Sequence, residues 1–281
     1  MLTYFEKKYP NSYKYFVIEK KVAECAPLYF NQPLIDKIHI TGQWGGFSDS
    51  DIRLAKSCDA HATFENIKHD TPDWYNYRCQ VEETARLGGI YDLKEVLTEE
   101  EMMPKLERWF DVGYQNFEEG TYVGAHHQDN AYFNGSIAIW PFAMAVHAGR
   151  SPSVEWWKRL VDTLILEGYR VLQFGYSSDP ILSENKDGFY KRFNDNSYFD
   201  QVRFALATNF SIGTDSGNMW VMGAYSHPAI HLITNFLPGH SKNVLALAPI
   251  NKNATNLFVE DGVDNIKYND IVSKIKEVVP L

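Results

Sequence analysis

The chain has few cysteines, no long apolar run and no excess of positive charge, and each absence excludes a class of protein. The three cysteines among its 281 residues have spacings unlike those of metal ligands and suit buried thiols in a reducing cytoplasm. Its apolar stretches are shorter than the roughly 18 residues that a membrane span needs. The first residues, MLTYFEKKYPN, also lack the basic start and apolar run of a signal peptide. A formal net charge of −9 argues against sequence-independent binding of nucleic acid, which needs a basic face.

What the chain does contain is apolar and aromatic residues, at 44% and 15%, which indicates a folded protein with a core. Its length suits one large domain or two ordinary ones. Strand-like and helical segments alternate in the first half, and this alternation predicts a parallel sheet covered by helices. We expect a helix end at residues 1–9, strands at Tyr13–Ile18, Lys37–Ile40 and Cys58–Phe64, and helices at Lys21–Phe30 and Tyr77–Leu87.

The stretch from Phe110 to Gly135 breaks this pattern with Gly, Asn, His, Glu and Tyr residues, which is typical of a linker. We therefore predict two domains, residues 1–125 and 126–281. His126 and His127 in this stretch have metal-ligating side chains, but adjacent histidines rarely share one metal ion. A solvated loop without a metal is the expected structure there.

The second half repeats the α/β alternation more clearly. In an open sheet of this kind, ligands bind at the carboxyl ends of the strands. Trp140, Trp156 and Trp157 are expected in the core or on a domain face rather than on a sugar-binding surface. The predicted strands are Ser136–Trp140, Tyr169–Phe174, Ser211–Thr214 and Ala229–Ile233, and the predicted helices are Ser153–Glu167, Tyr198–Ala207 and Asn218–Tyr225.

The tripeptide Asp215-Ser216-Gly217 lies at the turn between a predicted strand and a predicted helix. Ser216 is a favourable N-cap residue. A helix that starts at such a turn directs free N–H groups and the positive end of its dipole outward, where a phosphate binds. Gly217 allows a ligand to approach the backbone. The tripeptide therefore predicts a phosphate site, and the alternative is a simple helix cap.

Two further segments follow strands of the same predicted sheet and would meet the tripeptide at one edge. Arg150 precedes the start of a helix, where its guanidinium can neutralise phosphate charge. Its alternative role is an ion pair with Glu155. Gly175 ends the strand YRVLQF, either for purely structural reasons or to admit a ligand.

In this half the chain resembles the heptosyltransferase-like glycosyltransferases of family nine, which have the GT-B fold. That family has an apolar strand, a Lys- or Arg-Trp-Pro-type loop that opens a helix, a strand ending in Gly, and an Asp-Ser/Thr-Gly-x-x-His motif. The corresponding segments here are Arg150–Trp157, LQFG ending at Gly175, and Asp215–Trp220. The resemblance covers residues 136 to about 235 and extends more loosely to the first half. It implies that Asn218 and Trp220 also contact the donor.

The chain departs from the family pattern at two places. The histidine of the last motif is replaced by Trp220. In addition, the family begins with a strand and a Gly-Asp turn whose Asp is the proposed general base, whereas this chain begins at a position inside the family's first helix. The base therefore has no counterpart from the resemblance. Asp49 and Asp51, in GGFSDSD, are candidates for a replacement, although a simple turn is the favoured interpretation of that segment.

The resemblance implies an α/β protein with two Rossmann-like domains whose parallel sheets face a cleft, the first domain holding the acceptor and the second the nucleotide sugar. The expected protein is a cytoplasmic, metal-independent glycosyltransferase that needs no cofactor beyond its donor substrate and transfers the sugar to a saccharide or another hydroxyl acceptor. A modified base in viral DNA is a possible acceptor, although the charge disfavours nucleic acid. A nucleotide-sugar epimerase and a nucleotide-sugar-binding protein without catalysis remain open as alternatives.

Overall fold

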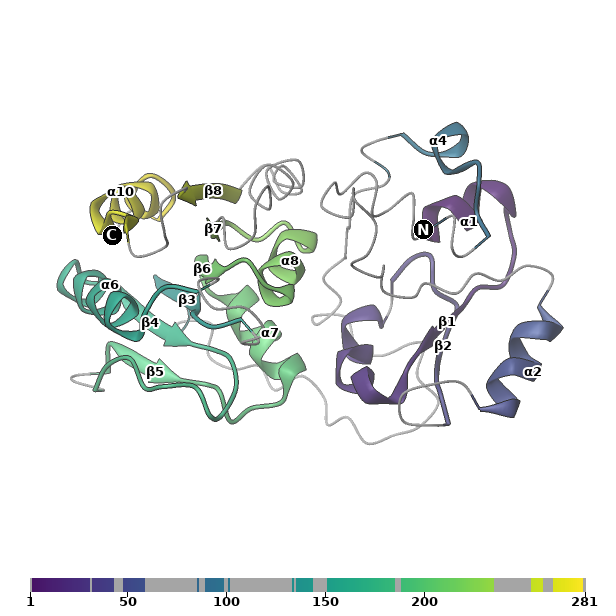
Figure 1. The fold of residues 1–281 in the computed structure, drawn as a ribbon, viewed down its shortest axis with the longest axis horizontal. Coiled ribbons are helices and arrows are strands. Elements are labelled where there is room, and N and C mark those ends of the chain that lie inside the picture. The colour runs from purple at the N-terminus through teal and green to yellow at the C-terminus, as the bar shows by residue number, and fades with distance from the viewer. Residues whose placement is uncertain are drawn as a thin grey trace. The chain divides into compact units, whose positions relative to one another are not determined.

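The computed structural model describes residues 2–30, 32–42, 48–58, 85, 89–98, 101, 133, 135–143, 151–184, 188–234, 254–259 and 265–279. The chain divides into two compact units, Met1–His126 and His127–Leu281 (Figure 1). The linker prediction for residues 110–135 lies almost entirely outside the described residues.

The first unit contains a small parallel sheet. Its strands β1 (Tyr15–Ile18) and β2 (Lys37–Ile40) pair in parallel, with Val17 opposite His39. Both strands were predicted and are confirmed. The segment between them, predicted as a helix, forms the 3-10 helix η1 (Lys20–Tyr29). Helices α1 (Leu2–Lys8), α2 (Asp49–Ser57) and α4 (Leu93–Val96) complete the described elements of this unit.

The segment that contains Asp49 and Asp51 is a helix, so its interpretation as a turn was wrong. The Ser48 hydroxyl accepts a hydrogen bond from the Asp51 backbone N–H, and the Asp51 carboxylate accepts one from the Ser48 backbone N–H. This reciprocal capping box satisfies two backbone donors that the first turn would otherwise leave free. The other two predictions for this unit, the strand Cys58–Phe64 and the helix Tyr77–Leu87, fall largely outside the described residues.

The second unit contains a six-stranded sheet in which each neighbouring pair of strands is parallel. This confirms the predicted fold class. The spatial order is β5-β4-β3-β6-β7-β8, so β3 lies between β4 and β6. Two strands, β5 and β8, were not predicted. The bounds are β3 (Ser136–Trp140), β4 (Arg170–Gln173), β5 (Tyr190–Arg192), β6 (Phe210–Thr214), β7 (Ala229–Thr234) and β8 (Ala254–Val259).

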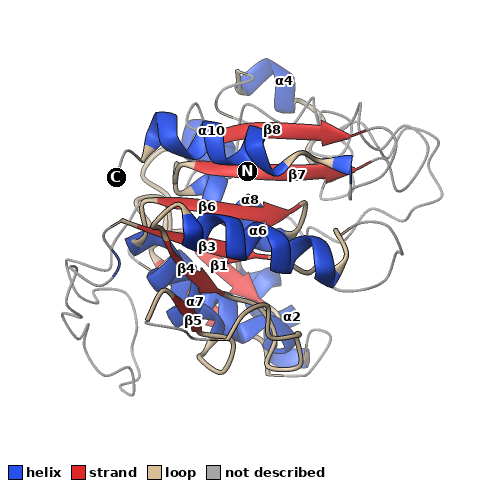
Figure 2. Cartoon of the chain, turned by 90° about the vertical axis from the view of Figure 1, so that its left-hand side faces the viewer, coloured by secondary structure: helices blue, strands red, loops and turns tan. Residues whose placement is uncertain are grey.

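Helices cover both faces of this sheet, as Figure 2 shows for α6 (Val154–Leu166) and α10 (Tyr268–Val278) in front of the strands. These two helices share one apolar core with alternate residues of the strands, among them Ile137 and Ile139 of β3. The opposite face carries α7 (Tyr198–Ala207) and α8 (Gly217–Ala224), and α8 packs on β6 and β7. Because strand side chains alternate between faces, the residues between those of the first core point toward α7 and α8.

The three tryptophans named from the sequence are core residues, as predicted. Trp156 and Trp157 lie in α6 and belong to its apolar core. Trp140 lies on the other face of β3 and stacks on Phe174, with 5.0 Å between the ring centroids. In the part of the chain that the structure describes, no helix is long and apolar enough to cross a membrane.

Candidate functional site

The carboxyl ends of β3, β4 and β6 lie side by side, because β3 is hydrogen-bonded to both of the other strands. The Thr214 hydroxyl at the end of β6 donates to the Pro141 carbonyl just after β3, at 2.8 Å. Further along, the Ala143 N–H donates to the Ser151 hydroxyl at 3.2 Å, close to the start of α6. The predicted meeting of the segments after these strands is thus built into the sheet.

The loop after β4 is fixed by hydrogen bonds to its own backbone. The Tyr176 N–H donates to the Asp179 carboxylate at 2.8 Å, and Asn194 Nδ2 donates to the Tyr176 carbonyl at 2.8 Å. Arg192 Nη2 donates to the carbonyls of Ser177 at 2.5 Å and of Asp179 at 2.9 Å. These contacts hold the loop in one conformation.

Gly175 begins this loop and has a structural reason to be glycine. Its φ is +138°, a value that residues with a side chain rarely adopt. A Cβ atom there would come within 2.2 Å of Asp179 Oδ2, and the Gly175 N–H already donates to Gln201 Oε1 at 2.8 Å. Of the two roles considered from the sequence, the geometry supports the structural one.

Gly213 of β6 leaves room for side chains that α8 and β3 place against it. A Cβ atom on Gly213 would lie 2.5 Å from Met219 Sδ and 2.9 Å from Trp140 Cβ. Glycine at this position therefore allows α8 to pack directly on β6. The first turn of α8 begins shortly after the end of β6, because only Asp215 and Ser216 separate the two elements.

Ser216 occupies the N-cap position of α8, but its side chain does not cap the helix, so this part of the prediction was wrong. Its backbone is extended, with φ −157° and ψ 162°, and the side chain makes no capping hydrogen bond. The residue is only 6% exposed, and its hydroxyl oxygen is buried without a hydrogen-bond partner among the described residues. A buried hydroxyl normally has a partner, so this group is one that a ligand atom can satisfy.

Gly217 is the first residue of α8 and is exposed. A Cβ atom there would meet no atom of the described residues within 4 Å. Its backbone is helical, so glycine is not required for the conformation. Asn218, the next predicted contact residue, is half-buried in the same turn.

Asp215 is buried at the end of β6, with 4% of its surface exposed. Its N–H donates to the Leu232 carbonyl at 3.1 Å, and its carboxylate accepts a hydrogen bond from Trp220 Nε1 at 3.1 Å. Trp220, which stands where the family motif has a histidine, thus supplies an N–H donor to this carboxylate. The pair joins the strand end to the first turns of α8.

His231 belongs to the same cluster and was missed from the sequence. It lies in the middle of β7, opposite Gly213, and its ring packs edge-on against Trp220 with 6.3 Å between centroids. Burial lowers the pKa of His231 to about 4, and the nearby Asp215 carboxylate opposes this shift. Its Nε2 atom is buried and has no hydrogen-bond partner among the described residues. The feature of the sequence that could have identified it is a histidine in the middle of the mostly apolar strand AIHLIT.

Asp215, Ser216, Gly217, Asn218 and Trp220 thus follow one another from the end of β6 into the start of α8, and His231 of β7 lies near Asp215 and Trp220. Arg150 lies outside the described residues, so its predicted place beside this cluster stays a prediction. In the described ranges no group of three or more His, Cys, Asp or Glu side chains is arranged to hold a metal ion.

No protein-family model and no curated protein matches the chain, but several solved structures are similar in fold. ADP-heptose LPS heptosyltransferase II from E. coli is 13% identical, with a TM-score of 0.64 over 99% of this chain and 92% of its own. A glycosyl transferase of family 9 from Veillonella parvula DSM 2008 is 12% identical, with a TM-score of 0.60 over 99% and 91%. E. coli heptosyltransferase WaaC with ADP is 12% identical, with a TM-score of 0.53 over 98% and 92%. These similarities confirm the predicted heptosyltransferase-like GT-B fold.

Proposed function

We propose that this chain is a glycosyltransferase that binds the diphosphate of a nucleotide-activated sugar at the start of α8. The observation that carries the proposal is the buried Ser216 hydroxyl, unpartnered among the described residues, next to the exposed backbone of Gly217. The N-terminus of α8 supplies N–H donors and a partial positive charge, which together attract a phosphate. The open space in front of Gly217 leaves room for such a group.

The fold supports the same assignment. Two of the similar structures are described with adenosine nucleotides in their names, one as an ADP-heptose heptosyltransferase and the other as a heptosyltransferase with ADP. ADP is therefore the natural first probe for this chain, and ADP-heptose the first donor to test. In this assignment residues 126–281 bind the donor and residues 1–125 hold the acceptor, which is a saccharide or another hydroxyl compound.

The chemistry of the proposed transfer requires stabilisation of the departing diphosphate. The α8 N–H groups supply this without a metal ion, and Arg150 adds a positive charge. Asp215, whose carboxylate is fixed by Trp220, borders the site. It can accept a hydrogen bond from the donor or hold the position of the turn. The cytoplasm, where nucleotide sugars are made available as substrates, is the proposed location.

Gly217→Val provides the direct test, because the valine side chain would fill the open space in front of the helix start. We expect ADP affinity, measured by isothermal titration, to fall at least about 30-fold, which corresponds to about 2 kcal/mol. The melting temperature of the ligand-free variant should stay close to that of the parent. Gly217→Ala, with a smaller side chain, should produce an intermediate loss. Equal ADP affinities in the parent and the valine variant would contradict the proposal.

Incubation with a panel of nucleotide sugars separates the three candidate functions. Transfer or slow hydrolysis releases the nucleoside diphosphate, epimerisation changes the sugar alone, and a binding protein does neither. A glycosylated modified base in DNA as product would identify nucleic acid as the acceptor, whereas a glycosylated saccharide would support the acceptor class proposed here.

A further inference from the structure

His231, in the middle of β7, has no part in the donor contacts proposed above. The residue is 7% exposed, and its Nε2 atom is buried without a hydrogen-bond partner among the described residues. Buried polar atoms normally have a partner, and one that lacks it costs stability. An apolar side chain at this position of the strand AIHLIT would avoid that cost. Packing of the sheet therefore does not explain the histidine.

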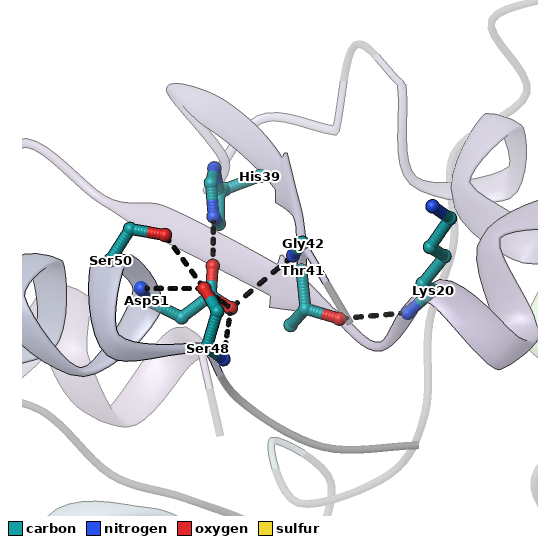
Figure 3. A network of polar contacts seen from close by, with 7 residues as sticks. All are labelled: Lys20, His39, Thr41, Gly42, Ser48, Ser50 and Asp51. Carbon is teal, nitrogen blue, oxygen red and sulfur yellow. Dashed lines mark hydrogen bonds and ion pairs between the residues drawn. The ribbon is translucent and has the colours of Figure 1, made fainter. Parts of the chain in front are cut away.

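His39, in the first unit, is a histidine whose Nε2 atom does have a partner. That atom lies 2.6 Å from Oδ1 of Asp51, at the start of α2 (Figure 3). The other carboxylate oxygen of Asp51 accepts hydrogen bonds from the Ser48 N–H at 2.6 Å and the Gly42 N–H at 3.3 Å. This cluster bonds the histidine without any ligand, whereas His231 has a carboxylate nearby but no bond at Nε2.

The neighbours of His231 determine which charges act on it. Its register partners are Gly213 of β6 on one side and Asn256 of β8 on the other, and its ring packs edge-on against Trp220 of α8. The three neighbouring elements, FSIGT, ATNLFV and GNMWVMGA, contain no titratable residue. Asp215, which directly follows β6, is the described charged group that acts on the imidazole of His231.

Two opposed effects act on His231 in the ligand-free protein. Burial disfavours the charged ring and lowers the pKa of His231 to about 4, and the Asp215 carboxylate opposes this shift. The ring is therefore uncharged at neutral pH. A second negative charge nearby would act in the same direction as Asp215, because each anion stabilises an imidazolium.

A diphosphate at the start of α8 would bring such a charge to the same part of the sheet. Asp215 directly precedes Ser216, and the Ser216 carbonyl accepts the backbone N–H of Trp220 at 3.2 Å. The indole N–H of Trp220 donates to the Asp215 carboxylate at 3.1 Å, and the same indole ring contacts His231. Charges in a buried setting of this kind are weakly screened by salt, so they interact without direct contact.

We propose that His231 takes up a proton when a nucleoside diphosphate binds at the start of α8. This inference rests on the proposed function. The proton comes from the buffer and binds to the ring nitrogen that carries the lone pair. The imidazolium then offsets part of the negative charge that the ligand adds beside Asp215. Because the charge is formed only in the complex, the ligand-free protein avoids the cost of burying a cation.

Proton uptake makes diphosphate binding depend on pH, since the ligand and the proton each favour binding of the other. The ligand raises the pKa of His231 above its ligand-free value of about 4. Affinity is therefore constant above the pKa of the complex and rises as the pH falls through it. The rise ends near pH 4, where His231 is protonated without the ligand.

The test is isothermal titration of ADP into the full chain at pH 7.5 and pH 5.5, in two buffers of different ionisation enthalpy. His231→Gln keeps a polar side chain but cannot take up a proton. It also serves as the reference for ADP itself, whose terminal phosphate titrates near pH 6. Between pH 7.5 and pH 5.5 we expect the ADP affinity of the parent to rise at least about fivefold more than that of the variant. At pH 5.5 the parent should also take up more protons from the buffer.

His227→Gln is the matched control, because His227 is a buried histidine that follows the opposite end of α8. It should behave like the parent, and a loss of proton uptake in this control as well would contradict the assignment to His231. The NMR signal of the His231 ring, identified by its absence in His231→Gln, gives a direct measurement in the parent. At pH 5.5 it should move from the position of a neutral ring toward that of a charged ring when ADP is added.

The outcomes separate this inference from the proposed function. Equal pH dependence and equal proton uptake in the parent and His231→Gln, with ADP bound by both, would overturn the role of His231 and leave the proposed function intact. An unchanged ring signal in the ADP complex of the parent would do the same. Absence of ADP binding in the parent would overturn both proposals. If His231→Gln has a lower melting temperature, His231→Phe provides the second variant for the same comparison.

Discussion

The ends of β4 and β6 belong to the same sheet edge but differ in how their polar groups are satisfied. After β4, Arg192 and Asn194 each bond loop carbonyls, although one further polar atom of each is buried without a partner among the described residues. After β6, the only polar atom of the Ser216 side chain has no such partner, and Gly217 faces open space. The hydrogen bonds within the β4 loop fix its shape, whereas the Ser216 hydroxyl has no such bond and lies next to the exposed Gly217, so a ligand can bond to it.

Replacing Gly175 or Gly217 by alanine should give the largest expected difference in unfolding free energy between these two strand ends. Gly175→Ala forces a side chain into a left-handed backbone and into Asp179, which must release the Tyr176 N–H. We expect a loss of about 3 kcal/mol in the free energy of unfolding, measured with urea. Gly217→Ala should change it by less than about 0.5 kcal/mol, because the added methyl meets no described atom. Similar losses in both variants would remove the distinction.

The pH dependence of stability tests how deeply the β6 end is buried. His231 has a pKa of about 4 when folded, against 6.5 for an ordinary imidazole. Between these values the unfolded chain binds a proton that the folded chain does not, so stability falls as the pH decreases from about 6.5 to 4. From pH 7 to pH 5 the parent should lose about 2 kcal/mol more than His231→Phe, which has no titrating ring. Parallel losses in both proteins would show that His231 is solvated.

Trp220→Phe tests the hydrogen bond that holds Asp215. The variant keeps an aromatic ring but removes the indole N–H that donates to the buried carboxylate. We expect a loss of about 1 kcal/mol in unfolding free energy, since one hydrogen bond is removed and other contacts of Asp215 remain. Trp220→His, which restores a ring N–H, should recover part of this loss. An unfolding free energy equal to that of the parent in Trp220→Phe would show that the bond contributes nothing.

The strands of the second unit were predictable where they are apolar and continuous. SIAIW and the segment ending in SIGT are buried throughout, and such runs identify inner strands of a parallel sheet. β5 was missed because its three residues, YKR, contain no apolar run, and β8 because ATNLFV has Thr and Asn ahead of its short apolar end. In the first unit SDSD has the composition of a turn, and the capping box that makes it a helix depends on the geometry of Ser48 and Asp51.

The candidate site was predictable in position but not in its contacts. The place of Asp215-Ser216-Gly217 after a strand and before a helix follows from the pattern of apolar residues. Residue type does not determine whether Ser216 caps the helix, because Ser48 and Ser153, which are also extended serines at N-cap positions, do cap theirs. His231 was missed because its surroundings come from residues distant in sequence, Trp220 and Asp215.

Ser216→Ala tests whether the hydroxyl after β6 serves a ligand or the helix, and its expected change in stability is small. A serine that caps a helix loses about 1 kcal/mol when it is replaced by alanine. Here the hydroxyl makes no capping bond and is buried without a partner among the described residues. The free energy of unfolding of the ligand-free variant should therefore stay within about 0.5 kcal/mol of the parent, because no hydrogen bond is lost. ADP affinity should fall about fivefold to tenfold, since the hydroxyl would donate to a phosphate oxygen in the complex.

Ser153→Ala is the matched control, because it removes a hydroxyl that does accept the Trp156 N–H at the start of α6. It should lose about 1 kcal/mol in stability. The reverse result for Ser216→Ala, lower stability with unchanged ADP affinity, would identify an ordinary helix cap and leave the β6 end no different from the other helix starts of the sheet.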